Sequence, residues 1–213
     1  MEQLAMRSYP YATDSNERKN VLLGLVCVSI LAAWTLHSIL SYGELVIPWW
    51  LDAPSVGGFL TLFYTAFDKW LWKKTIIRKL CLTRIPDLNG IWSGYIQSSF
   101  DDHSKKLPVK ANIKQTWTEI NMLVITESSK SCSLTATMTM DDRGASVLSY
   151  EYLNEPGPDA AKTMHMHRGF TALTLSNDGC ALSGPYYSGR DRQNFGFLHL
   201  ERELKTSALA EEK

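Results

Sequence analysis

The sequence predicts a membrane-anchored all-β protein: a membrane α-helical hairpin followed by a small eight-stranded antiparallel up-and-down β-barrel. Two observations carry this prediction. Residues 21–42 form an uncharged apolar run, and residues 89–205 repeat short alternating segments between turn signals. A spanning helix needs about 20 mostly apolar residues, and period-two alternation is typical of half-buried strands.

The first predicted span is residues 21–42, VLLGLVCVSILAAWTLHSILSY. At 1.5 Å per residue this run covers the hydrocarbon core of a bilayer, which is about 30 Å thick. It is longer than the apolar part of a signal peptide, and no small-x-small cleavage site accompanies it. The alternative is a buried core helix, but a helix that is apolar on every face requires a much larger domain around it.

A second span follows in APSVGGFLTLFYTAF, which reaches spanning length when it is extended through Trp72. Asp68 and Lys69 lie near its end, where ionisable side chains reach lipid headgroups. The linking segment GELVIPWWLD holds the Trp49–Trp50 pair, which suits the membrane interface. We therefore expect two transmembrane helices within residues 21–74.

Basic residues flank both outer ends of the predicted hairpin, and the linking segment has no Lys or Arg. The positive-inside rule then places both termini and the barrel in the cytoplasm. The basic residues are Arg7, Arg18, Lys19, Lys69, Lys73, Lys74, Arg78, Lys79 and Arg84. The expected domains are a cytoplasmic N-terminal tail (1–20), the hairpin (21–74), a basic connector (75–88), the barrel (89–205) and a C-terminal tail (206–213).

The charge pattern limits the partners of the chain. Its 22 basic and 22 acidic residues balance, but the basic excess lies beside the membrane segments and the barrel region is mildly acidic. This distribution suits anionic headgroups and does not suit long nucleic acid. The four cysteines form no CxxC pair, so we expect reduced structural thiols.

The barrel region contains about eight strand-like segments. In SCSLTATMTM the residues Cys132, Leu134, Ala136, Met138 and Met140 are predicted to share the dry face. The segments are 90–99, 108–117, 120–128, 131–141, 145–154, 163–176, 180–188 and 195–204.

Turn signals at 141–144 and 177–179 favour antiparallel hairpins between consecutive strands. Closure into a barrel removes exposed sheet edges, and an open sandwich is the alternative. Four glycines lie within strand patterns, where they permit bulges or tight coiling. They are Gly94, Gly169, Gly184 and Gly196.

Catalytic motifs are missing from the sequence, so we expect no enzyme activity, no cofactor and no metal. No Walker, Rossmann, kinase or GxSxG signature occurs. His165 and His167 have the spacing of two ligands on one strand face, but they lack acidic or cysteine partners in a recognisable motif. We interpret them as outward-facing strand histidines.

Aromatic, arginine and amide side chains near strand ends form a candidate nucleotide site. Flat rings stack on bases, Arg binds phosphate oxygens in a bidentate manner, and Gln or Asn can contact base edges. The candidates are Trp92, Tyr95, Gln115, Trp117, Tyr186, Tyr187, Arg190, Arg192 and Asn194.

Some candidates have a competing structural role. Trp92 can equally fill the core, Tyr95 has the opposite parity and suits the surface or rim, and solvent exposure competes for the two arginines. A set of six inward residues is large enough to fill the barrel, which would place binding at its rim. That set is Trp92, Ile96, Ile113, Trp117, Met138 and Met140.

The order of parts resembles the two-transmembrane, β-strand-rich effectors of bacterial CBASS antiphage systems, which are associated with cyclic-oligonucleotide synthases. The resemblance covers nearly the whole chain. It rests on two N-terminal spans, a basic connector, a strand opening PDLNGIWSGYIQSS and the later stretch LSGPYYSGRDRQNFGFLHLER.

The resemblance implies a receptor in the inner membrane whose barrel binds a cyclic dinucleotide made on infection. The protein would then oligomerise and disrupt the membrane, which causes abortive infection. His37 and Asp68 are candidates to face a water-filled path in such an oligomer. Two other functions compete: a membrane-tethered lipocalin-like carrier of a small apolar ligand, and a structural anchor with an interaction barrel.

Overall fold

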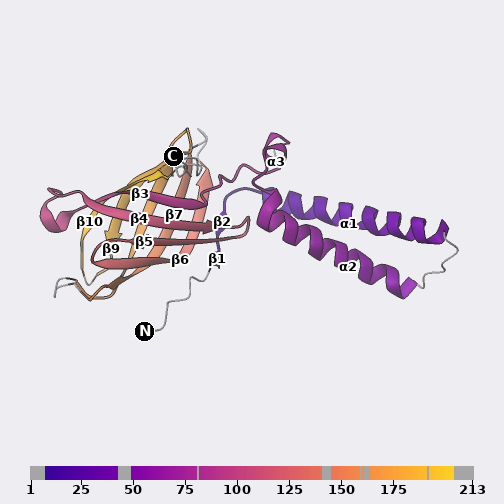
Figure 1. Ribbon diagram of the computed structural model, residues 1–213, viewed down its shortest axis with the longest axis horizontal. Coiled ribbons are helices and arrows are strands. Elements are labelled where there is room, and N and C mark those ends of the chain that lie inside the picture. Colours follow the sequence, from indigo (N-terminus) through magenta and orange to yellow (C-terminus); the bar gives the residue numbers. More distant parts are fainter. Residues whose placement is uncertain are drawn as a thin grey trace, which may run out of the picture. The chain divides into compact units, whose positions relative to one another are not determined.

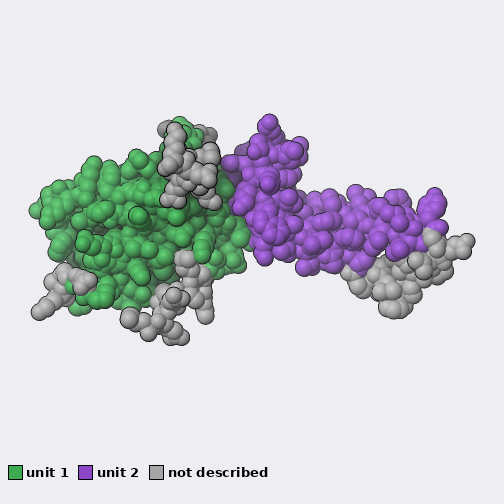
Figure 2. Space-filling view, in the orientation of Figure 1, with its two compact units in different colours: residues 1–14, 86–213 green, residues 15–85 purple. Residues whose placement is uncertain are grey.

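A computed structural model describes residues 8–42, 49–80, 82–140, 145–158, 160, 164–190 and 192–203, with no account of the side chains of residues 49–54. The chain divides into two compact units (Figure 2). Residues 15–85 form one, and residues 1–14 together with 86–213 form the other.

The helical unit contains α1 (Glu17–Tyr42), α2 (Trp49–Ala66), a π-helical continuation (Phe67–Leu71) and the short α3 (Thr75–Lys79) (Figure 1). Within the described residues, α1 is the one helix long and apolar enough to cross a membrane, with a mean hydropathy of 2.0. The buried residues of α1 are Val21, Ser29 and Ala33. The Ser29 hydroxyl donates a hydrogen bond to the Leu25 carbonyl at 2.7 Å. The predicted tip of the hairpin lies outside the described residues.

Eight strands of the second unit form the closed barrel that the alternation predicts. Each pairs antiparallel with its sequence neighbour, and the last strand returns to pair with the first. The strands are β3 (Gly90–Ser98), β4 (Leu107–Gln115), β5 (Glu119–Ile125), β6 (Ser129–Met140), β7 (Ser146–Pro156), β8 (His167–Leu175), β9 (Ala181–Ser188) and β10 (Phe195–Arg202).

Two of the predicted glycines lie where neighbouring strands approach closely. A Cβ on Gly94 would lie 1.9 Å from the carbonyl oxygen of His199, and one on Gly184 would lie 1.9 Å from that of Ala172. These glycines allow the short sheet to coil tightly enough to close. Gly179, in the predicted turn at 177–179, has a φ of +73°. The predicted turn at 141–144 lies outside the described residues.

The predicted dry face of β6 is wrong in its first half. The register shifts between Ser133 and Thr135, a bulge that changes which face each side chain occupies. Ala136 and Met138 are buried as expected, but Cys132 and Leu134 are half-exposed, and Ser133 is buried instead.

Large side chains fill only one half of the barrel interior. This core holds Trp92, Ile113, Trp117, Met122, Met138, Leu148, Leu173, Leu182 and Leu200. The prediction of a completely filled barrel is therefore wrong, because Ile96 lines open space and Met140 is half-exposed at the end of β6. The other half of the interior is a cavity.

The sequence did not predict two short strands at the start of the chain, β1 (Tyr9–Pro10) and β2 (Ala12–Thr13). The first pairs with β5 and the second with β6, so residues within the expected N-terminal tail belong to the barrel unit.

Candidate functional site

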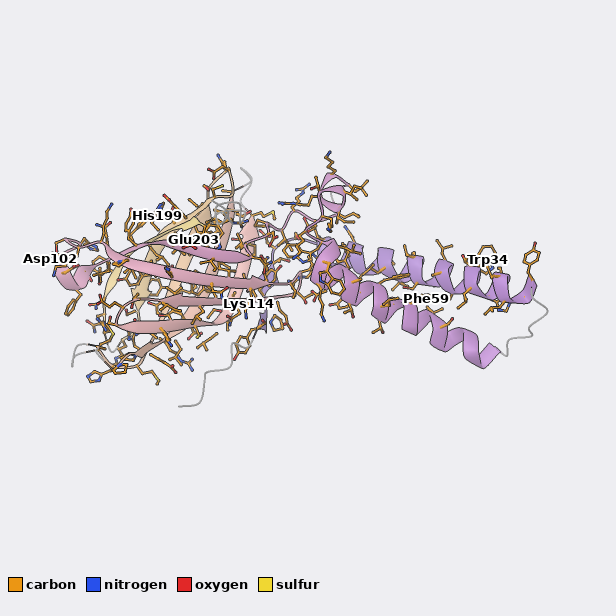
Figure 3. The ribbon with its side chains drawn as sticks, in the orientation of Figure 1. Trp34, Phe59, Asp102, Lys114, His199 and Glu203 are labelled. Atoms are coloured by element: carbon orange, nitrogen blue, oxygen red, sulfur yellow. The ribbon has the colours of Figure 1, made fainter. Side chains whose placement is uncertain are left out.

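The open half of the barrel is a cavity of about 620 Å³. It is lined by the last residues of β3, β5, β7 and β9 and by the first residues of β4, β6, β8 and β10. In an up-and-down barrel those ends meet at one mouth. Asp102, in the β3–β4 connection, marks the mouth end, whereas Lys114, near the end of β4, lies toward the filled end (Figure 3). The volume falls in the range of about 300–1,000 Å³ that is typical of small-molecule sites.

Three tyrosines from β7 and β9 line this cavity: Tyr150, Tyr152 and Tyr186. Burial raises the pKa of all three, and that of Tyr152 reaches about 12. All three are therefore neutral at physiological pH. They offer flat rings together with hydroxyls that can donate or accept.

Among the described residues, Arg192 is the one arginine that lines the cavity. With the Asn194 amide oriented to satisfy both of its groups, the amide oxygen accepts from Arg192 Nε at 2.8 Å and the amide nitrogen donates to the Arg192 carbonyl at 3.2 Å. The guanidinium lies 5.7 Å from the Phe100 ring centroid. Asn194 and Phe100 thus hold one end of the guanidinium in place.

The Nη1 atom of that guanidinium has no hydrogen-bond partner among the described residues. Its Nη1 is buried, and so is the equally unpartnered Oδ1 of Asp101, another cavity residue. A buried guanidinium nitrogen without an acceptor is costly, and an anionic oxygen is the acceptor that suits it best. This geometry makes Arg192 a candidate contact for a phosphate.

Several neutral polar groups interrupt the remaining wall, which is mostly apolar. Ser131 donates to Asn154 Oδ1 at 2.8 Å, Thr171 donates to the Pro185 carbonyl at 2.9 Å, and the Thr126 and Ser129 hydroxyls lie 3.0 Å apart. The Ser131 and Thr171 hydroxyls act here as donors and so keep lone pairs that can accept from a ligand, and the Asn154 amide nitrogen can donate to a ligand oxygen. The wall therefore suits a ligand with several polar groups.

The interpretation of both histidines as outward-facing is wrong for His167. It is buried, lines the cavity, and has its Nδ1 2.8 Å from the His165 carbonyl oxygen, whereas His165 is exposed. Among the described residues no group of three His, Cys, Asp or Glu side chains is placed to hold a metal ion.

The structure brings three of the nine predicted site residues together in the cavity: Tyr186, Arg192 and Asn194. It places Tyr187 and Arg190 on the outside. The Tyr187 ring lies tilted against that of Phe170 with ring centroids 5.4 Å apart, and Arg190 is exposed.

The other four predicted residues also lie away from the cavity. Trp92 is fully buried, donates from Nε1 to the Leu88 carbonyl at 3.0 Å, and belongs to the core. Trp117 and Gln115 are buried at the filled end, while Tyr95 lies on the outer face with its ring 5.3 Å from that of His199.

Sequence reasoning missed the contribution of β7. Tyr150, Tyr152 and Asn154 alternate along SVLSYEYLNEP on the same parity as the buried Leu148. This alternation alone predicts that all three side chains point into the barrel. The signal was overlooked because tyrosine and asparagine are also common on exposed strand faces.

Comparisons with known proteins agree with this division of the chain. A family model described as "Cap15, cyclic dinucleotide receptor domain" matches residues 83–202, and one described as "Cap15, TM helices" matches residues 19–73. The chain is 29% identical to CD-NTase-associated protein 15 of Yersinia aleksiciae, covering 70% of this chain and 69% of that protein. It is 24% identical to CD-NTase-associated protein 15 of Staphylococcus schleiferi, covering 67% of this chain and 75% of that protein.

Proposed function

Since the chain belongs to the Cap15 family, with its cyclic dinucleotide receptor domain and transmembrane region, we propose that its barrel cavity binds a cyclic dinucleotide and that binding leads to self-association and membrane disruption. In this proposal the chain is the effector of a CBASS antiphage system, it has no catalytic activity, and its action on the inner membrane causes abortive infection.

The observation that carries the proposal is that Nη1 of Arg192, in a cavity of about 620 Å³, has no partner in the part of the chain that the structure describes. A cyclic dinucleotide brings two phosphates and two bases. Arg192 is suited to one phosphate, the neutral hydroxyls and Asn154 to other polar groups, and the rings of Tyr150, Tyr152 and Tyr186 to the bases.

Two buried polar atoms in the mostly apolar lining argue against the alternative of a lipocalin-like carrier. A carrier of an apolar molecule needs an apolar lumen, because a buried polar group without a partner destabilises the complex. Here Arg192 and Asp101 both point unpartnered polar atoms into buried space. An apolar ligand would leave both atoms unsatisfied.

The helical unit supports the membrane part of the proposal. The proposed topology has two spans, within residues 21–74, and both termini in the cytoplasm. Gly57 and Gly58 of α2 are exposed, and nothing lies within 4 Å of a Cβ placed on either. Small exposed residues let helices of neighbouring copies approach closely in a membrane. Binding would promote assembly only if the ligand has higher affinity for the assembling state.

Thermal unfolding of the full chain in detergent tests the binding step. The probes are cyclic dinucleotides carrying each pairing of the four RNA bases, with linear dinucleotides and mononucleotides as controls. At about 100 times Kd a ligand of the folded state raises the melting temperature on the order of 10 °C. A saturable rise with at least one cyclic member is expected. Cooperative melting with no rise for any member would contradict the proposal.

A further inference from the structure

The first described residues of the chain form a strap across the barrel wall. We define this N-terminal strap as residues 8–14, which include β1 and β2 (Figure 1). Tyr9 and Pro10 pair antiparallel with Ile120 and Glu119 of β5. Ala12 and Thr13 pair parallel with Thr137 and Met138 of β6. One short segment therefore contacts both strands.

The strap occupies a place where the barrel wall is otherwise incomplete. Direct pairing between β5 and β6 covers only residues 123–125 against 130–132. Beyond it Ser133 Oγ accepts a hydrogen bond from Met122 N at 2.9 Å, and the bulge after Ser133 follows. At the other end of the hairpin, residues 119–120 of β5 and residues 137–138 of β6 pair with the strap instead of with each other, so the strap bridges the open part of the seam between β5 and β6.

Specific contacts hold the strap in the seam. Tyr11 is 1% exposed, its hydroxyl donates to the Trp117 carbonyl at 2.8 Å, and its backbone N donates to the Thr118 carbonyl at 3.2 Å. Gln115 Nε2 donates to the same hydroxyl at 3.4 Å, and Asp14 Oδ2 accepts from Met140 N at 3.0 Å. The strap is thus held against the barrel by these hydrogen bonds and by the buried Tyr11 side chain.

The strands that hold the strap also line the ligand cavity. Val124 and Thr126 from the end of β5 and Ser129 and Ser131 from the start of β6 face the cavity at one end of this hairpin. The strap binds the other end of the same hairpin. In the sequence, the strap is followed after two residues by Glu17, the first residue of α1. One hairpin therefore touches both the cavity and the segment that leads into the apolar helix.

We propose that the N-terminal strap couples the cavity to the membrane helix, and that a ligand in the cavity releases the strap from the β5–β6 seam. This inference rests on the proposed function and specifies its regulation. The strap pairs with each strand over only two residues, so its release breaks fewer strand pairings than the separation of two neighbouring barrel strands would. Ligand must then have higher affinity for the released state, and by linkage a weaker strap must strengthen ligand binding.

A reversible disulfide between the strap and β6 tests the proposal on the full chain. Ala12 and Thr137 are register partners on neighbouring strands, where side chains share a face at a spacing that a disulfide can bridge. Ala12 is exposed and Thr137 half-exposed, so the double variant Ala12→Cys/Thr137→Cys leaves the core intact. The single variants Ala12→Cys and Thr137→Cys are matched controls for the native cysteines.

The readout is dye release from phosphatidylethanolamine–phosphatidylglycerol vesicles that contain the protein, with the same cyclic dinucleotide panel. We expect the oxidised double variant to bind ligand at least severalfold more weakly and to release no dye, and dithiothreitol to restore both properties. Tyr11→Ala should show the reverse, with tighter binding and release at a lower ligand concentration.

The outcomes separate the two proposals. Ligand-dependent release by the oxidised double variant equal to that of its reduced form would overturn the strap proposal and leave the receptor function standing. A loss of binding in Tyr11→Ala that still folds would also overturn the strap proposal. A parent chain that neither binds any member nor releases dye would remove the receptor function and the strap proposal with it.

Discussion

Two arginines two residues apart provide the sharpest prediction. Arg192 lines the cavity with a buried and unpartnered Nη1, whereas Arg190 is exposed and lies away from it. Replacing each with Gln removes the same charge from the same loop. If a ligand phosphate pairs with Arg192, only the Arg192→Gln variant should lose affinity.

The size of that loss follows from the contact that is removed. A hydrogen bond to a charged group contributes about 1.5–3 kcal/mol, and about 1.4 kcal/mol corresponds to a tenfold change in Kd. Arg192→Gln should therefore weaken binding by about 10- to 150-fold. Arg190→Gln should change Kd by less than about twofold, since exposed charges at a distance are screened by salt.

Isothermal titration calorimetry of the full chain in detergent measures this difference at one fixed salt concentration. The melting temperature of each unliganded variant is the control for folding. Equal losses for both variants, or an unchanged Kd for a folded Arg192→Gln, would refute the assignment of Arg192 as the phosphate contact.

Three further predictions follow from the barrel. Ser131→Phe should narrow the cavity and lower ligand affinity at least about tenfold while the protein still melts cooperatively; calorimetry with unchanged affinity would place the ligand elsewhere. Gln115→Leu removes the acceptor of the buried Leu88 N–H, so unfolding in denaturant should show a loss of about 1–3 kcal/mol, and an unchanged midpoint would contradict this. Burial raises the pKa of Tyr152 from 10.0 to about 12, so the stabilisation from its neutral form is complete below about pH 10 and is lost as pH rises toward 12. The melting temperature of Tyr152→Phe should fall less than that of the parent over that interval, and parallel curves would contradict the assignment.

The architecture was predictable because strand alternation and turn residues report burial directly. The strand segments expected at 108–117 and 195–204 correspond closely to β4 and β10. Val109, Ala111 and Ile113 alternate along β4, and all three are buried. Closure was also predictable, because eight consecutive antiparallel strands leave two edges that can pair with each other.

The cavity was less predictable because its lining depends on features without a sequence period. The bulge after Ser133 changes the phase of β6 and brings Ser129 and Ser131 inward. Arg190 and Arg192 lie in a loop, where neither alternation nor composition separates a cavity residue from a surface one. The sequence pattern allows Trp92 either in the core or in the site. Only the packing shows that it belongs to the core at the filled end of the barrel.

The N-terminal strap was missed for a similar reason. Each of its strands has two residues, which is too short for any alternation pattern. Its partners lie more than 100 residues later in the sequence, and its anchor is a single tyrosine. Gln115 is a polar residue that shares the buried face of β4 with apolar side chains. Its contacts in the structure are Leu88 N, the Pro86 carbonyl and the Tyr11 hydroxyl.

The most direct measurement is an experimental structure of the protein bound to the cyclic dinucleotide that raises its melting temperature most. We expect ligand density inside the barrel, with a phosphate oxygen within hydrogen-bond distance of Arg192 and a base against Tyr150, Tyr152 or Tyr186. Density on the outer face of the barrel, beside Tyr187 or Arg190, with the cavity unchanged, would contradict the account.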